Sequence, residues 1–77
     1  MKKTLVASAE CLGEPVLYYL LCGAGGYGIG VEYRGEEALI PGLCSGITAA
    51  KNLLERMVHG IVTPATARDI AEDWLCK

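Results

Sequence analysis

The first candidate for a functional site in the sequence is a glycine-rich run. Residues 23–28 read GAGGYG and match the G-x-G-x-x-G pattern of loops that hold the pyrophosphate of a dinucleotide. That chemistry requires a helix directly after the glycines, because the free N–H groups of its first turn bind the phosphates. Residues 29–33 instead alternate in the manner of a strand. The run is therefore interpreted as a hairpin turn and not as a nucleotide site.

A thiol and an imidazole could form a nucleophilic pair. The candidate thiols are those of Cys11, Cys22, Cys44 and Cys76, and the candidate imidazole is that of His59, the only histidine. No acidic residue is placed to orient this imidazole, as a catalytic pair would require. No two cysteines have the roughly two to four intervening residues of a zinc site, and disulfides would require export. Residues 4–6 are far shorter than the ~7–15 apolar residues of a secretory signal. We therefore expect free thiols in a cytoplasmic protein, with no catalytic residue, no metal and no cofactor.

Three acidic residues near the C-terminus form a second group. Asp69 and Asp73 are four residues apart and share a helix face, with Glu72 beside them. Paired carboxylates can bind a divalent cation or act as acid and base. The simpler interpretation is an exposed acidic face that keeps the domain soluble. A third interpretation is a docking face for a basic partner.

Length and charge limit the classes of protein. A chain of 77 residues is expected to form one domain, residues 1–77. The net charge is −2 and the basic residues are scattered, so the cation cluster of a nucleic-acid-binding protein is missing. Residues 15–31 carry no charge, yet they fall short of the ~20 residues that cross a membrane and contain five glycines. We expect neither a nucleic-acid partner nor a membrane span.

The elements that must position these residues are strands first and helices afterwards. Strand periodicity runs over about residues 3–41, and residues 16–22 are apolar on both faces, as in a central strand. Helix periodicity follows over about 46–59, with Ser45 as N-cap, and over about 64–76, where Trp74 would anchor the helix. The sequence predicts an α+β fold, in which an antiparallel meander of three to four strands precedes two helices packed on one face.

Two helices can cover only one face of such a sheet, which leaves an apolar set of the central strand without a covering layer. Gly28 and Gly30 share one strand face, and glycine inside a strand often marks close approach by another backbone or a ligand. We expect an interface with a second copy or another protein over Val16, Tyr18, Leu20, Gly28 and Gly30. The alternative is a partly exposed sheet face with nothing bound to it.

The pattern of the second half resembles a known family. Residues 27–29 (YGI) and 31–32 (VE), the helix start at Ser45, and Thr63-Pro64 followed by residues 69–75 (DIAEDWL) carry the likeness. They resemble a small bacterial family described as a domain of unknown function, over about residues 16–75. The resemblance implies a cytoplasmic bacterial protein with an α+β fold, and it implies no activity.

The sequence thus favours a non-enzymatic interaction module that self-associates or binds an unidentified protein. The alternative is a small-molecule-binding protein or minor enzyme that uses the glycine turn, a cysteine and His59. It requires a pocket beside the turn with a thiol near the imidazole. Docking through Asp69, Glu72 and Asp73 is a third hypothesis.

Overall fold

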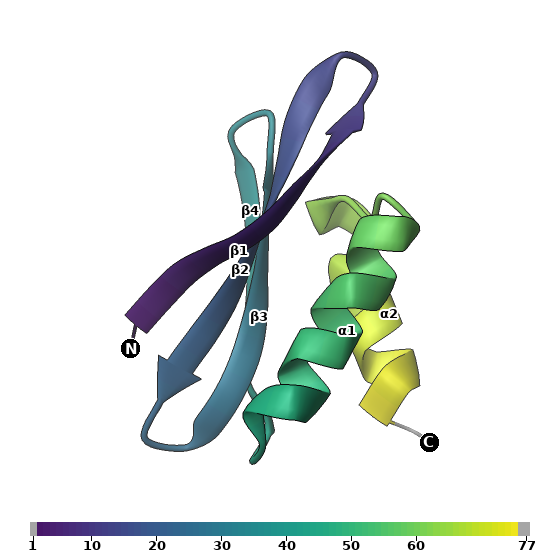
Figure 1. The fold of residues 1–77 in the computed structure, drawn as a ribbon. Helices are drawn as coiled ribbons and strands as arrows, with labels where there is room; N and C mark the ends of the chain where they lie inside the picture. Colours follow the sequence, from purple (N-terminus) through teal and green to yellow (C-terminus); the bar gives the residue numbers. More distant parts are fainter. Residues whose placement is uncertain (1, 76–77) are drawn as a thin grey trace.

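A computed structural model describes residues 2–75, apart from the side chains of Cys44, Trp74 and Leu75. Four antiparallel strands lie side by side in chain order and two helices follow, which confirms the predicted α+β meander (Figure 1). The elements are β1 (Lys2–Cys11), β2 (Glu14–Gly23), β3 (Gly26–Tyr33), β4 (Glu36–Cys44), α1 (Ile47–His59) and α2 (Pro64–Leu75).

Tight turns set the register of the sheet. Leu12 and Gly13 have φ of 53° and 82°, and Arg34 and Gly35 have 51° and 82°, so both turns have positive φ at their two central residues. This is the geometry of the two-residue turns that match the twist of a hairpin. At the other end of the sheet Gly23 pairs with Gly26, so the glycine run is a hairpin turn as predicted, and β3 follows it.

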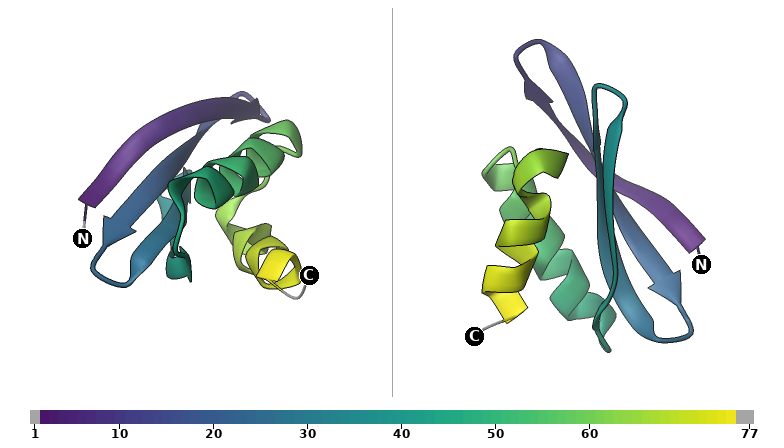
Figure 2. Two further views of the ribbon diagram at one scale, coloured as in Figure 1. Left: turned by 60° about the horizontal axis from the view of Figure 1, so that its bottom comes forward. Right: turned by 180° about the vertical axis from the view of Figure 1, so that it is seen from behind.

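Both helices pack on the same face of the sheet, which we call the helix face (Figure 2). α1 lies mainly over β2 and β3, and α2 lies mainly over β4. Residues from all of these elements form one apolar core, made of Val16, Tyr18, Leu20, Ile29, Val31, Ala38, Ala50, Leu53, Leu54, Met57, Val62, Ala67 and Ala71.

The helix ends differ in part from expectation. The N-cap of α1 is Gly46 and not Ser45, and no side-chain hydrogen bond caps this end within the described residues. At the C-terminal end Val62 donates its N–H to the carbonyl of Met57, and Ile61 donates to Val58. Ile61 therefore takes the left-handed position of a Schellman motif, with φ of 49°. The role of Trp74 as an anchor lies outside the described side chains.

Candidate functional site

The five residues of the predicted interface lie on two different faces. Val16, Tyr18 and Leu20 are buried in the core beneath the helices. Because directly paired residues of antiparallel strands share a face, the register of β2 with β3 decides where the glycines lie. Gly28 pairs with Leu21 and Gly30 with Tyr19, which places both glycines on the face opposite the helices, the outer face. The prediction that grouped the five residues on one surface is therefore wrong.

The chain's own fourth strand covers the two glycines. β4 has extra residues between its pairings with Ile29 and Tyr27, so its backbone crosses close over Gly28. A Cβ at Gly28 would collide with the carbonyl oxygen of Ile40 and would lie 2.6 Å from Cα of Pro41. At Gly30 the side chain of Leu39 takes the space. The close approach predicted from glycine exists, but the chain supplies it itself.

An ion pair between β1 and β4 covers part of the outer face. Nζ of Lys3 lies 2.7 Å from Oε2 of Glu37 and 4.4 Å from the ring centroid of Tyr19. The hydrogen bond to Glu37 raises the pKa of Lys3. Lys3 and Glu37 belong to the two edge strands, near opposite ends of the sheet. The twist of the sheet, visible as the steep crossing of β1 over β4 in Figure 1, brings these corners together.

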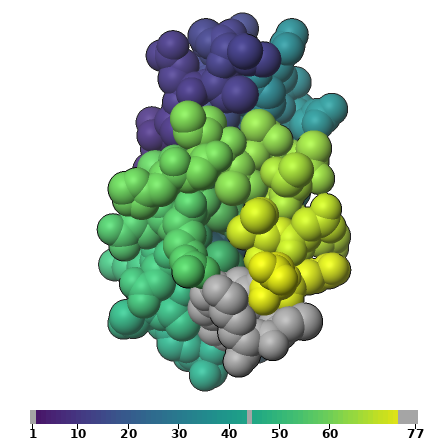
Figure 3. Space-filling view, turned by 90° about the vertical axis from the view of Figure 1, so that its right-hand side faces the viewer, coloured from purple at the N-terminus to yellow at the C-terminus, as the bar shows by residue number. Residues whose placement is uncertain are grey.

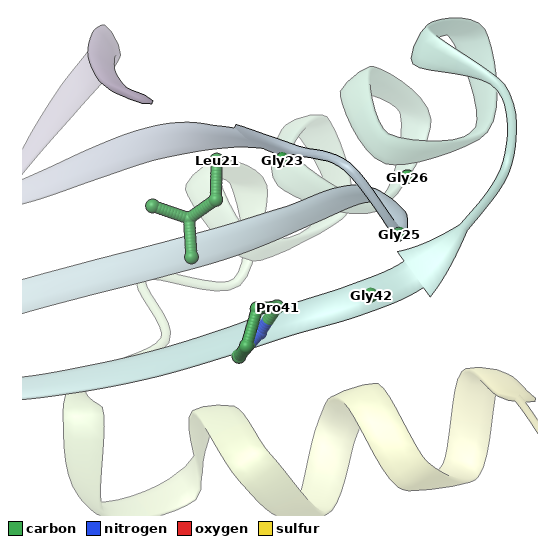
Figure 4. Close-up of a pocket in the computed structure, with 6 residues that line it drawn as sticks. All are labelled: Leu21, Gly23, Gly25, Gly26, Pro41 and Gly42. Atoms are coloured by element: carbon green, nitrogen blue, oxygen red, sulfur yellow. The ribbon is translucent and has the colours of Figure 1, made fainter. Parts of the chain in front are cut away.

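A pocket of about 210 Å³ does open beside the glycine turn (Figure 4). Its described lining is Leu21, Gly23, Gly25, Gly26, Pro41 and Gly42, and it includes neither a histidine nor a cysteine side chain. α1 begins near this end of the sheet, and its thirteen residues carry His59 about 20 Å away along the helix axis. The structure therefore does not bring the glycine turn and His59 together, as the small-molecule alternative requires.

The thiols and carboxylates form no joint site in the described part of the chain. Cys11 and Cys22 are free and half-buried near opposite ends of β2, and the side chains of Cys44 and Cys76 lie outside the description. Asp69, Glu72 and Asp73 are exposed on α2. No group of three metal-ligating side chains occurs among the residues described.

The surface that sequence reasoning missed lies between β1 and α1. No residue of β1 is buried, whereas β2 and β3 contain several buried residues each. An apolar groove of about 290 Å³ runs between this strand and α1, floored by Val6, Ala7, Leu54 and Val58, with Lys51 and Glu55 of α1 along its rim. Leu5 and Val6 are 55% and 44% exposed. Seen from the helix side, the helices fill most of the surface and the β1–β2 hairpin projects beyond them (Figure 3).

A β-bulge explains why the groove was missed. Leu5 pairs with Tyr19 and Ala7 with Tyr18, so Val6 is an extra residue in β1. The alternation of side chains changes phase at that point, and Val6 lines the groove on the helix side. A sequence signal exists, since Val6 is the one apolar residue in the alternate set Thr4, Val6, Ser8 and Glu10 of this strand.

None of the helices described is long and apolar enough to cross a membrane. Comparison with known proteins finds no matching family model, no matching curated protein and no matching solved structure. The resemblance to a bacterial domain of unknown function stays a prediction.

Proposed function

We propose that this protein is a non-enzymatic interaction module whose binding surface is the edge strand β1 together with the groove between β1 and α1. The observation that carries the proposal is the uneven cover of the sheet: the helices bury residues of β2, β3 and β4 and none of β1. An edge strand offers unpaired N–H and C=O groups to another chain. The groove adds an apolar area with a charge of each sign on its rim.

Strand addition is a recognised way for a small domain to bind protein, because backbone hydrogen bonds supply affinity and side-chain pockets beside the edge supply specificity. The groove lies where such a pocket is needed, next to the strand that would be extended. Cytoplasmic location is part of the proposal and is supported by the free thiols of Cys11 and Cys22.

The test compares two variants that place the same charge on different surfaces. Val6 in the groove is 44% exposed and Ile70 on α2 is 39% exposed, so Val6→Asp and Ile70→Asp have similar folding costs. Each tagged variant is used to capture proteins from cells that express the natural chain, after circular dichroism has shown that it is folded. We expect a protein retained by the wild type and by Ile70→Asp to be lost by Val6→Asp. Equal retention by all three would contradict the proposal.

A further inference from the structure

Two hairpin turns at one end of the sheet share a geometry and differ in chemistry. The β1–β2 turn has Leu12 at its first central position and the β3–β4 turn has Arg34, with φ of 53° and 51°, and a glycine follows each of them. Leu12 is 89% exposed, more than any other large apolar side chain in the described part of the chain. Because Arg34 forms the same turn with a charged side chain, the turn geometry does not require an apolar residue at Leu12.

Leu12 makes its own turn less stable than another residue would. A two-residue turn of this kind favours asparagine, aspartate or glycine at a central position, because a positive φ is unfavourable for most other residues. The side chain of Leu12 is not among those that form or pack against the apolar core. Its apolar surface is therefore left in water. Leu12 thus carries a conformational cost that no core contact among the described residues offsets.

The β1–β2 hairpin holds Leu12 clear of the other strands. The pairing of β2 with β3 begins at Val16, so Glu14 and Pro15 of β2 pair only with β1. The end of the hairpin therefore extends beyond β3, and it also projects beyond the two helices (Figure 3). A partner can reach Leu12 without displacing any other part of the described chain.

The projecting turn is nevertheless fixed in position. The hydroxyl of Tyr33, at the end of β3, donates a hydrogen bond of 3.1 Å to the carbonyl oxygen of Cys11, the residue before Leu12. Cys11 also pairs with Glu14 across the hairpin. A side chain whose backbone is already ordered requires less loss of conformational entropy when it binds. Leu12 therefore combines high exposure with a rigid support.

We propose that Leu12 inserts into an apolar pocket of a partner protein that has a basic residue at the rim of that pocket. Glu10 and Glu14 are exposed, lie two residues to either side of Leu12 and supply the complementary charge. The same carboxylates are repelled by the phosphates of nucleic acids and of anionic membranes, which favours a protein as the partner. The contact is additional to the proposed binding surface, because Leu12 lies six positions, about 20 Å, beyond Val6 along β1.

The two hairpins provide a matched test in the intact chain. Leu12 is replaced by a photoreactive diazirine residue in one variant and Arg34 in another, and both variants are irradiated in cells that express the natural chain. We expect a discrete protein to be crosslinked from position 12 and not from position 34. Charge reversal at the flanking acids, Glu10→Lys with Glu14→Lys, should abolish that crosslink.

The crosslinked protein is then purified, and calorimetry measures its dissociation constant for each variant. Leu12→Asn should weaken binding roughly tenfold or more, because the apolar side chain that fills the pocket is lost. Leu12→Met keeps an apolar side chain of similar volume and should bind within about threefold of the wild type. Arg34→Asn changes the equivalent position of the other turn and should leave the constant unchanged. Leu12→Asn should also raise the midpoint of urea unfolding, since asparagine is favoured at this φ, so unfolding is excluded as the cause of the lost binding.

Several results would overturn the inference. Equal binding by Leu12→Asn and the wild type would do so, as would crosslinking from both positions alike or from neither. Binding of the chain to phosphatidylcholine vesicles that is lost on Leu12→Asn, without a crosslinked protein, would assign the turn to a lipid surface instead.

This inference and the proposed function fail separately. A partner that is lost on Val6→Asp and retained by Leu12→Asn removes the inference and leaves the proposed function. A partner that is lost on Leu12→Asn and retained by Val6→Asp does the reverse.

Discussion

The hydroxyl of Tyr18 donates a hydrogen bond to the carbonyl oxygen of Val62, with 2.9 Å between the two oxygens. Tyr18 is fully buried at the centre of β2, and Val62 lies in the connection between α1 and α2. The bond therefore joins the sheet to the turn that sets the angle between the helices. It also satisfies the one polar atom of a ring in an otherwise apolar core.

Tyr18→Phe removes this bond and leaves the ring in place. We expect the free energy of unfolding to fall by about 1 kcal/mol, because the carbonyl of Val62 loses its partner in a buried position. Urea denaturation followed by circular dichroism measures the change. Tyr19→Phe removes the same atom from a half-buried ring on the outer face and is the matched control. Equal losses in the two variants would show that the bond contributes nothing specific.

Stability should decline at alkaline pH. Burial raises the pKa of Tyr18, and burial together with a hydrogen bond to Cys11 raises the pKa of Tyr33. The unfolded chain releases these protons near pH 10, before the folded chain does, so the stabilisation is complete below about pH 10 and is lost as pH rises above it. Lys3 contributes in the same direction, since its pKa is also raised.

The contribution of Tyr18 to this decline can be isolated. Thermal unfolding of the wild type and of Tyr18→Phe is compared between about pH 8 and pH 11.5. The stability of the wild type should fall more steeply with pH than that of Tyr18→Phe. The decline that both proteins show comes from Tyr33 and Lys3. Parallel curves would contradict the assignment to Tyr18.

Two glycines of β3 should respond differently to alanine. A Cβ at Gly28 meets the backbone of Ile40 and Pro41, which cannot move without breaking the β3–β4 pairing. At Gly30 the closest atom is Cδ2 of Leu39, 2.9 Å away, at the end of a flexible side chain. We expect Gly28→Ala to cost about 2–3 kcal/mol and Gly30→Ala about 1 kcal/mol or less.

Gly25 provides the reference for this pair. A Cβ there meets nothing within 4 Å, so Gly25→Ala should change stability by no more than about 0.5 kcal/mol. Chemical denaturation of the three variants gives the order directly. A Gly28→Ala variant as stable as Gly25→Ala would show that β4 does not cross where the structure places it.

The end of α1 should gain stability from a change at Ile61. Its φ of 49° is unfavourable for a β-branched residue, and the side chain is exposed, so Ile61→Gly relieves the backbone and gives up little packing. We expect a gain of about 1 kcal/mol, measured as a higher midpoint in urea.

Gly60 is the contrasting position. It has φ of −88° and ψ of −1°, which any residue adopts, and an added Cβ would have ordinary contacts at 3.5 and 3.6 Å. Gly60→Ala should therefore be tolerated and should stabilise the domain by up to about 1 kcal/mol through the unfolded chain. A large loss at Gly60 would mean that the glycine, and not Ile61, takes the left-handed position.

Sequence by itself determined the order and kind of the elements. Alternation along residues 27–33 and the apolar stripe of residues 47–58 are local properties, with periods that differ between a strand and a helix. The register of β2 with β3 was also accessible, because a turn in which Gly23 pairs with Gly26 places Gly28 opposite Leu21. Counting outward from the turn would have separated Gly28 from Leu20.

Only the tertiary structure decided which face the helices cover and which strand they leave open. Side chains of β2 alternate between its two faces and are apolar on both, so the sequence does not decide whether Tyr18 or Tyr19 faces the helices. The contact of Lys3 with Glu37 follows from the twist of the sheet, and the irregular pairing at Val6 and opposite Gly28 belongs to strands that already lie side by side. That twist is a property of four strands together, and residues 34 positions apart in sequence meet only after it has formed.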